Sequence, residues 1–208
     1  MAHSIELMKL KHAVITSVDR DDLPDFGAAH WVKTIETIKQ VNPETTLEVL
    51  IPDFQGRTEL VELLAATRPD IISHNMETVR CLTPAVRSVA TYDRSLEVIR
   101  TIARFTATGV TAKSGIMVGL GETPQEVEEV MDDLLEVGCK ILTIGQYLQP
   151  TRKHYPVQEY VTPEQFRIYR EIGLKKGFEQ VESGPLVRSS YHAEKHIRHT
   201  ASAHPTQQ

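Results

Sequence analysis

The stretch with the clearest chemical potential runs from Ser114 to Glu122, where an apolar segment ends in two glycines and an acid. Glycine has no Cβ, so Gly119 and Gly121 allow a positive φ and a close approach of a ligand to the backbone. Thr123 follows as a helix N-cap, with proline at the first helical position and glutamate at N3. A strand, a glycine turn and a helix N-terminus form nucleotide-binding sites in many α/β proteins. A tight turn that binds nothing has the same pattern, so this stretch alone leaves both interpretations open.

Polar side chains also follow the other segments that resemble strands. In chain order they are Asp19 and Arg20; Asp53 and Gln55; His74, Asn75 and Glu77; Gly119 and Glu122; Gln146 and Tyr147. The carboxyl ends of parallel strands meet at one face, which is where α/β folds bind ligands. Five successive polar strand ends therefore favour an active site over ordinary loop polarity.

Strand-like and helix-like segments alternate along the chain. Strands are expected at 11–18, 46–51, 70–73, 111–118, 140–145 and 178–182. Helical periodicity or caps predict helices at 28–41, 60–64, 96–102, 123–137 and 162–177. This alternation predicts an α/β fold with a parallel sheet, either doubly wound or closed toward a barrel.

Composition narrows the class of protein. The 208 residues are 40% hydrophobic and 25% charged, which suits one globular domain, placed at 1–197 with a flexible tail at 198–208. The net charge of −5 and the lack of a long apolar run argue against nucleic-acid and membrane partners. Cys81 and Cys139 are the two cysteines of the sequence, which fits a cytoplasmic protein without a disulfide framework.

Several segments taken together resemble one family. They are 14–23, 52–56, 74–78, 113–122, 145–151 and 184–192, the last containing Arg188, Ser189, Ser190 and Tyr191. The chain is similar to lipoyl synthases, which are radical S-adenosylmethionine (SAM) enzymes. The resemblance implies a partial (βα)6 TIM-like barrel that here lacks its first strand.

The resemblance also implies a reaction and its cofactors. Lipoyl synthases use SAM and two [4Fe–4S] clusters to insert two sulfur atoms at C6 and C8 of a protein-bound octanoyl-lysine. The implied partners are an octanoylated lipoyl-carrier domain or H-protein, a low-potential electron donor and an iron–sulfur carrier.

Site residues follow from the family motifs, and none is assigned a catalytic role. Cofactor binding is expected of Asn75, Glu77, Lys113, Gly115, Gly119, Glu122, Gln146 and Arg188. Gly115, Gly119 and Glu122 match a GxIxGxxE pattern, with Met117 in the third position. Ser190 is the expected ligand of the auxiliary cluster, with Ser189 as the alternative.

The chain departs from the family in its cysteines, because neither of the family's two cysteine triads is present. The chain alone is therefore expected to be an inactive fragment, and a non-catalytic barrel remnant that serves as a binding or assembly module is the alternative. An unrelated aldolase-type barrel would need Lys113 as a Schiff-base lysine. Phe26 stands where the family has glycine, and it is expected to be strained if φ there is positive.

Overall fold

The computed structural model describes residues 1–190; the predicted tail at 198–208 and Tyr191 lie outside the described residues. Six parallel strands form one sheet in the order β1-β2-β3-β4-β5-β6, which is also their order along the chain. Their bounds are β1 His12–Thr16, β2 Thr46–Leu50, β3 Ile71–Ser73, β4 Thr111–Val118, β5 Ile141–Gln146 and β6 Gln180–Gly184. The first and last strands do not pair with each other, so the sheet stays open. The expected α/β partial barrel is confirmed.

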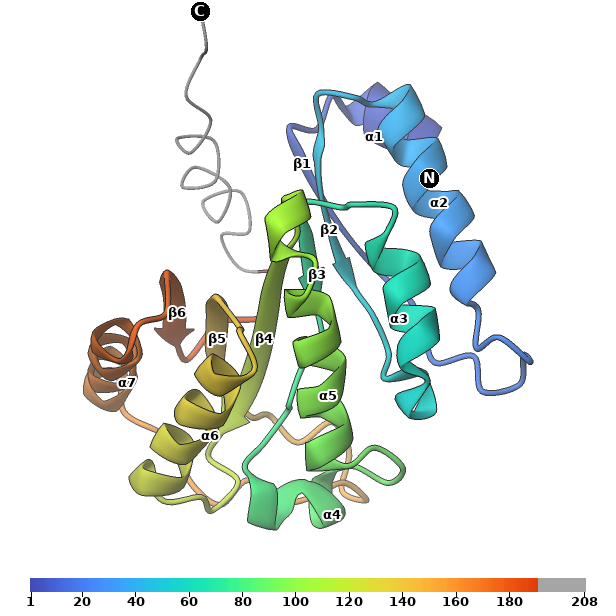
Figure 1. Ribbon diagram of the computed structural model, residues 1–208. Coiled ribbons are helices and arrows are strands. Elements are labelled where there is room, and N and C mark those ends of the chain that lie inside the picture. The colour runs from blue at the N-terminus through green and yellow to red at the C-terminus, as the bar shows by residue number, and fades with distance from the viewer. Residues whose placement is uncertain (191–208) are drawn as a thin grey trace, which may run out of the picture.

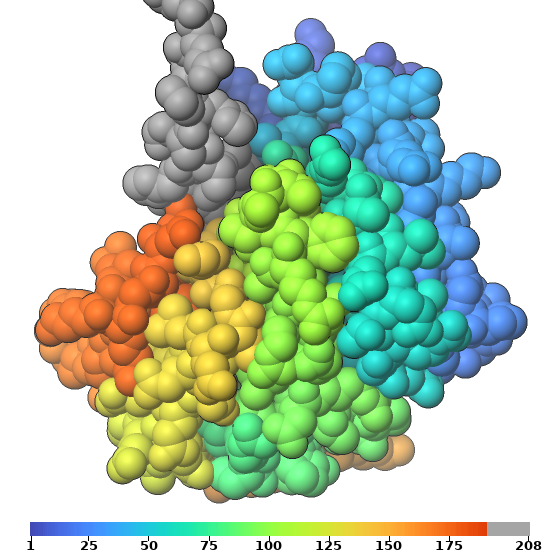
Figure 2. Space-filling view, viewed as in Figure 1, coloured from blue at the N-terminus to red at the C-terminus, as the bar shows by residue number. Residues whose placement is uncertain are grey.

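Helices cover one face of this sheet, side by side, as Figures 1 and 2 show. Their bounds are α1 Ala2–Met8, α2 Ala28–Val41, α3 Thr58–Ala65, α4 Thr83–Val86, α5 Tyr92–Ala103, α6 Pro124–Glu136 and α7 Pro163–Lys176. Short 3₁₀ helices are η1 Phe54–Gly56, η2 Arg80–Leu82 and η3 Thr106–Thr108. None of the helices within residues 1–190 is both long and apolar enough to cross a membrane.

The core lies between the strands and this helical layer. β4 is buried along almost its whole length, whereas β1 at the edge is mostly half-buried. Ile99 of α5 and Leu134 of α6 are fully buried and face the strands from the helical layer. Burial of such side chains contributes about 1.5–3 kcal/mol each, which is what holds these helices in place.

The helix that follows the glycine turn begins as the sequence predicts. The Thr123 hydroxyl accepts from the Glu126 amide, and the Glu126 carboxylate accepts from the Thr123 amide, which completes a capping box. Gly138 ends the segment with a φ of 88°. The capping box fixes where the N-terminus of α6 points relative to the end of β4.

Phe26 has a φ of 51°, which is the condition under which the sequence predicted strain at this residue. Asp25 accepts hydrogen bonds from the amides of Gly27 and Ala29, which starts α2 directly after this strained residue. The Phe26 ring packs against the core, and Arg57 lies 5.8 Å from its centroid. These contacts offset the backbone cost of a left-handed phenylalanine.

Candidate functional site

The carboxyl ends of the six strands meet at one edge, and two cavities lie there. The first, of about 270 Å³, is lined from β3, β4 and β5 and is called here the β4 cavity. The second, of about 400 Å³, is lined from the ends of β1, β2 and β3 and is called the β2 cavity. Asn75 and Glu77 line both, so the two cavities share one wall.

The β4 cavity brings together five of the residues predicted from the sequence. They are Asn75, Glu77, Gly115, Gln146 and Arg188. Lys113, Gly119 and Glu122 do not line it, and Ser189 lines it where Ser190 does not. The predicted cofactor residues therefore divide into a group at the cavity and a group around it.

Glu77 is held at the wall of both cavities by an unusual backbone. Its φ is 67°, and its amide donates to the Gly115 carbonyl at 3.1 Å while its carbonyl accepts from the Met117 amide at 2.8 Å. Burial raises the pKa of the carboxyl, against a hydrogen bond from Asn75 and the charge of Arg87. Glu77 thus combines a strained left-handed backbone with a desolvated carboxyl group at a cavity wall. Features of both kinds are concentrated at functional sites.

Gly115 is a glycine because its neighbours leave no room for a side chain. A Cβ there would lie 2.5 Å from the Thr143 hydroxyl and 3.1 Å from the Asn75 amide oxygen. The bare backbone at Gly115 forms the floor of the β4 cavity. Gly115 therefore contributes only backbone atoms to this cavity.

Glu122 holds the glycine turn together. Its carboxylate accepts from the Gly119 amide at 2.6 Å and from the Leu120 amide at 2.9 Å. A Cβ on Gly119, whose φ is 93°, would collide with the Gln146 amide nitrogen and the Glu159 carbonyl. In the described structure, the predicted cofactor residues Glu122 and Gly119 therefore contact other groups of the protein.

Gln146 fastens the irregular loop that follows β5. Its amide nitrogen donates to the carbonyls of Tyr147 and Glu159, both at 3.0 Å, and its oxygen accepts from the Val161 amide at 2.9 Å. The buried Gln146 side chain therefore fixes this loop next to the β4 cavity, which Gln146 and Leu148 line.

Lys113 lies inside the sheet and is 1% exposed. Its ammonium donates to the Glu48 carboxylate at 2.8 and 3.0 Å and to the Ser189 carbonyl at 2.6 Å. Burial lowers the pKa of the ammonium, and the adjacent Glu48 carboxylate opposes that shift. The Glu48 carboxylate also accepts from the Ser73 hydroxyl at 2.8 Å.

The β2 cavity contains a group that the sequence interpretation missed. Arg87 follows α4 and lines this cavity. Burial lowers the pKa of its guanidinium, and the carboxylates of Glu77, Asp53 and Asp19 oppose that shift. Its guanidinium donates to the Ser95 hydroxyl at 2.7 Å. No local pattern marked Arg87, because it lies in an irregular segment between two helices.

Behind Arg87 a buried histidine completes a hydrogen-bond chain. His74 Nδ1 lies 2.9 Å from the Ile51 carbonyl, and Nε2 lies 2.9 Å from the Ser95 hydroxyl. Because a carbonyl can only accept, the proton is assigned to Nδ1, so Nε2 accepts from Ser95. Burial lowers the pKa of His74 to about 4, which keeps the ring neutral.

The described residues contain no group of three His, Cys, Asp or Glu side chains arranged to hold a metal ion. Cys81 is exposed, with its thiol beside Glu126, whereas Cys139 is buried beside β4 and β5. Two separated thiols do not match a [4Fe–4S] cluster, which needs about four ligands. The β4 cavity, by contrast, presents an amide, a carboxylate, a guanidinium and bare backbone, which can bind a ligand through both hydrogen bonds and charge.

Comparisons with known proteins agree on one family. A model described as the radical SAM superfamily matches residues 2–134. The chain is 74% identical over 198 residues to a protein named lipoyl synthase from Bacteroides fragilis, covering 95% of this chain and 68% of that protein. A lipoyl synthase from Treponema denticola is 60% identical over 197 residues, covering 95% and 67%.

Solved structures show the same fold at low identity. Methylornithine synthase superposes with a TM-score of 0.59 at 12% identity, covering 92% of this chain and 67% of that one. The [FeFe]-hydrogenase maturase HydG gives 0.56 at 17% identity, covering 93% and 50%. These likenesses establish the architecture alone.

Proposed function

This chain belongs to the lipoyl synthase family of the radical SAM superfamily, and from that premise we propose that it forms the SAM-binding barrel of a lipoyl synthase. The reaction inserts two sulfur atoms at C6 and C8 of a protein-bound octanoyl-lysine. SAM and the iron–sulfur clusters supply the radical chemistry and the sulfur. The chain contributes the β4 cavity, the loops after β4 and β5, and residues 185–190 after β6.

The observation that carries this proposal is the convergence at the β4 cavity. Asn75 and Glu77 come from the end of β3, Gly115 from β4 and Arg188 from the segment after β6. We assign Asn75 and Glu77 to the ribose or ammonium group of SAM, and the Gly115 backbone to its adenine. We assign Arg188, which lines the same cavity, to a carboxylate or to the charge of a cluster.

Three predicted residues act through their neighbours in this proposal. Glu122 and Gly119 shape the turn after β4, and Gln146 holds the loop after β5. Ser190 is the proposed ligand of the auxiliary cluster, with Ser189 as the alternative, since both lie at the end of the segment that reaches the cavity.

The cysteine count limits what the chain does alone. Two cysteines do not supply the ligands of two clusters, so turnover requires thiolates from outside these 208 residues. An octanoylated carrier domain or H-protein, a low-potential donor and an iron–sulfur carrier are the proposed partners. The alternative, a non-catalytic binding module, is supported by the same cysteine count.

A chimera tests the proposal. The part of the Bacteroides fragilis lipoyl synthase that precedes the match is fused ahead of Met1, and lipoyl-lysine formation on an octanoylated carrier is followed by mass spectrometry. We expect product with SAM and a low-potential reductant. The variant Ser190→Ala should impair sulfur insertion more than SAM cleavage, whereas Asn75→Ala should depress SAM cleavage itself.

Each outcome of the chimera experiment has a meaning. If Ser189→Ala abolishes product and Ser190→Ala does not, the ligand is Ser189. If a soluble, cluster-loaded chimera neither cleaves SAM nor forms product, the binding-module alternative is favoured.

A further inference from the structure

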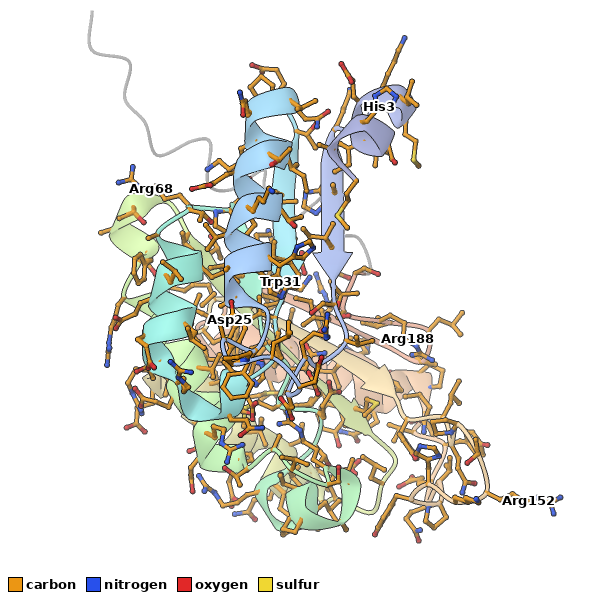
Figure 3. The ribbon with its side chains drawn as sticks, turned by 90° about the vertical axis from the view of Figure 1, so that its right-hand side faces the viewer. His3, Asp25, Trp31, Arg68, Arg152 and Arg188 are labelled. Carbon is orange, nitrogen blue, oxygen red and sulfur yellow. The ribbon has the colours of Figure 1, made fainter. Side chains whose placement is uncertain are left out.

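The chain after β6 folds back over the sheet, and residues 185–190 are called here the closing segment. The Val187 amide donates to the Gly184 carbonyl at 3.1 Å, which turns the chain, and the Val187 side chain is 5% exposed. The Val187 carbonyl occupies the space that a Cβ on Gly145 would need. In Figure 3, Arg188 lies beside the strands on the side away from α2 and α3. The closing segment thus crosses the face that the helices leave bare.

A buried ion pair meets the closing segment on that face. The Lys113 ammonium, on β4, donates to the Ser189 carbonyl at 2.6 Å. Glu48 on β2 accepts from the same ammonium and from Ser73 on β3. A hydrogen-bonded chain of side chains from three neighbouring strands, Ser73 to Glu48 to Lys113, therefore ends at one backbone carbonyl next to the proposed cluster ligand.

Stability of the sheet alone does not explain a charged pair at this place. Removing two charges from water costs several kcal/mol per ion, and apolar residues of similar volume often serve as well or better. A charge-assisted hydrogen bond to a carbonyl, however, is directional and stronger than a neutral one. An apolar pair could not hold the Ser189 carbonyl.

We propose that Lys113 and Glu48 form a latch that fixes the closing segment across the inner face of the sheet. Lys113 is then a positioning residue for Ser189 and Ser190. The role of Lys113 in sulfur insertion rests on the proposed function. The latch itself is a contact within the chain and does not depend on any cluster.

The test uses the full chain and a matched pair of double variants. Glu48→Gln/Lys113→Met removes the latch, and Glu179→Gln/Lys140→Met makes the same changes at a surface pair whose nitrogen and oxygen are 3.5 Å apart. Thermal unfolding reports whether each variant is folded. Trypsin cleavage after Arg188 and deuterium exchange of the peptide containing residues 184–190 report the state of the closing segment.

We expect the latch variant to stay folded and to be cut after Arg188 at least tenfold faster than the control variant. Tenfold corresponds to about 1.4 kcal/mol of lost local stability. Exchange in the 184–190 peptide should rise as well, with exchange elsewhere in the sheet unchanged. Equal cleavage and exchange in the two folded variants would overturn the latch.

The unmodified chain provides a second test if the latch variant does not fold. Arg152 and Arg188 are both exposed, but only the segment around Arg188 meets the latch. Cleavage after Arg188 should be at least tenfold slower than cleavage after Arg152, and equal rates would contradict the proposal. Neither measurement involves SAM or clusters, so a failed chimera and a failed latch are separate results.

Discussion

Glu77 combines two costs that a purely structural residue would avoid. Its backbone is left-handed, which costs on the order of 1–3 kcal/mol outside glycine, and its carboxylate is desolvated at the wall of two cavities. The amide and the carbonyl of Glu77 nevertheless both form hydrogen bonds to the backbone of β4. These two costs fit the proposed role of Glu77 in binding SAM, a role that is met at the expense of stability.

Replacement of this carboxyl should therefore stabilise the free chain. The folded pKa of Glu77 lies above its unfolded value, so its ionisation weakens the fold as pH rises through the folded pKa. Glu77→Gln should raise the Tm at pH 8 by about 2–4 °C, the shift that ~1 kcal/mol gives in a protein of this size. The exposed Glu136→Gln is the control. In the chimera the Glu77 variant should bind SAM more weakly, and a lower Tm would refute the argument.

His74 predicts the opposite pH dependence. Its folded pKa of about 4 lies below the ordinary 6.5, so stability is full above pH 6.5 and falls as pH drops toward 4. The loss over this window is about 3 kcal/mol at 1.36 kcal/mol per pH unit. Urea unfolding between pH 7 and 4 measures it. His74→Asn should flatten the profile and His30→Gln, on the surface, should not; a His74 variant with the original slope would contradict this assignment.

Gly115→Ala should close the floor of the β4 cavity. The added methyl meets the Thr143 hydroxyl and the Asn75 amide oxygen, so either Asn75 moves or the strand shifts. SAM affinity of the chimera should fall at least tenfold, about 1.4 kcal/mol, by calorimetry. Gly184→Ala is the control, because its Cβ would make an ordinary contact of 3.4 Å with Val187. Equal affinities in the two variants would place the adenine elsewhere.

Among the elements, the turn between β4 and α6 depends on one side chain. The Glu122 carboxylate accepts hydrogen bonds from two backbone amides of the turn, and among the described residues no other acceptor is seen for these amides. Glu122→Ala should leave α6 intact, since the capping box is made by Thr123 and Glu126. Deuterium exchange of Gly119 and Leu120 should accelerate, and SAM cleavage by the chimera should fall.

Glu122→Gln separates the two possible roles of this carboxylate. A glutamine oxygen still accepts from one of the two amides, so exchange should be intermediate between the original and the alanine variant. If glutamine restores the turn and SAM cleavage together, Glu122 acts on the loop. If the turn is restored without SAM cleavage, the carboxylate contacts the cofactor directly.

Elements with a strong periodic or capping signal were predicted well from the sequence. β4 was placed at its observed bounds, and α6 within a residue at either end, because a buried apolar run and a capping box are local signals. The segment with η2 and α4 was missed, since four-residue helices carry no periodicity. Arg87 was missed with it.

The site was predicted in part for a similar reason. Motif residues at strand ends, such as Asn75 and Gln146, do line one cavity because parallel strands end at a common edge. The partners of Lys113 could not be foreseen, because Glu48 is 65 positions away and Ser189 is 76 positions away. Contacts across a sheet depend on register, which one sequence does not reveal.

At the scale of the whole molecule, cysteine content decides the behaviour of the isolated chain. We expect anaerobic reconstitution with iron and sulfide to give no [4Fe–4S] cluster. A cluster needs about four ligands, and this chain has only two thiols, which lie apart. Iron and sulfide analysis with visible absorbance is the measurement, and the chimera is the positive control. Near-stoichiometric iron and sulfide in the chain alone would contradict the expectation.

The sheet order repeats the order of the chain, and this affects how the protein is made. Each strand from β2 onward pairs with the strand synthesised immediately before it. Synthesis proceeds from the N-terminus at about 5–20 residues per second, so β1 is the first strand to become available and β6 is the last. The partner of every new strand has therefore already been synthesised, and the strand made last forms the edge at which the next strand pairs. A ribosome pausing between β3 and β4 would leave that edge open longest, since 37 residues separate Ser73 from Thr111.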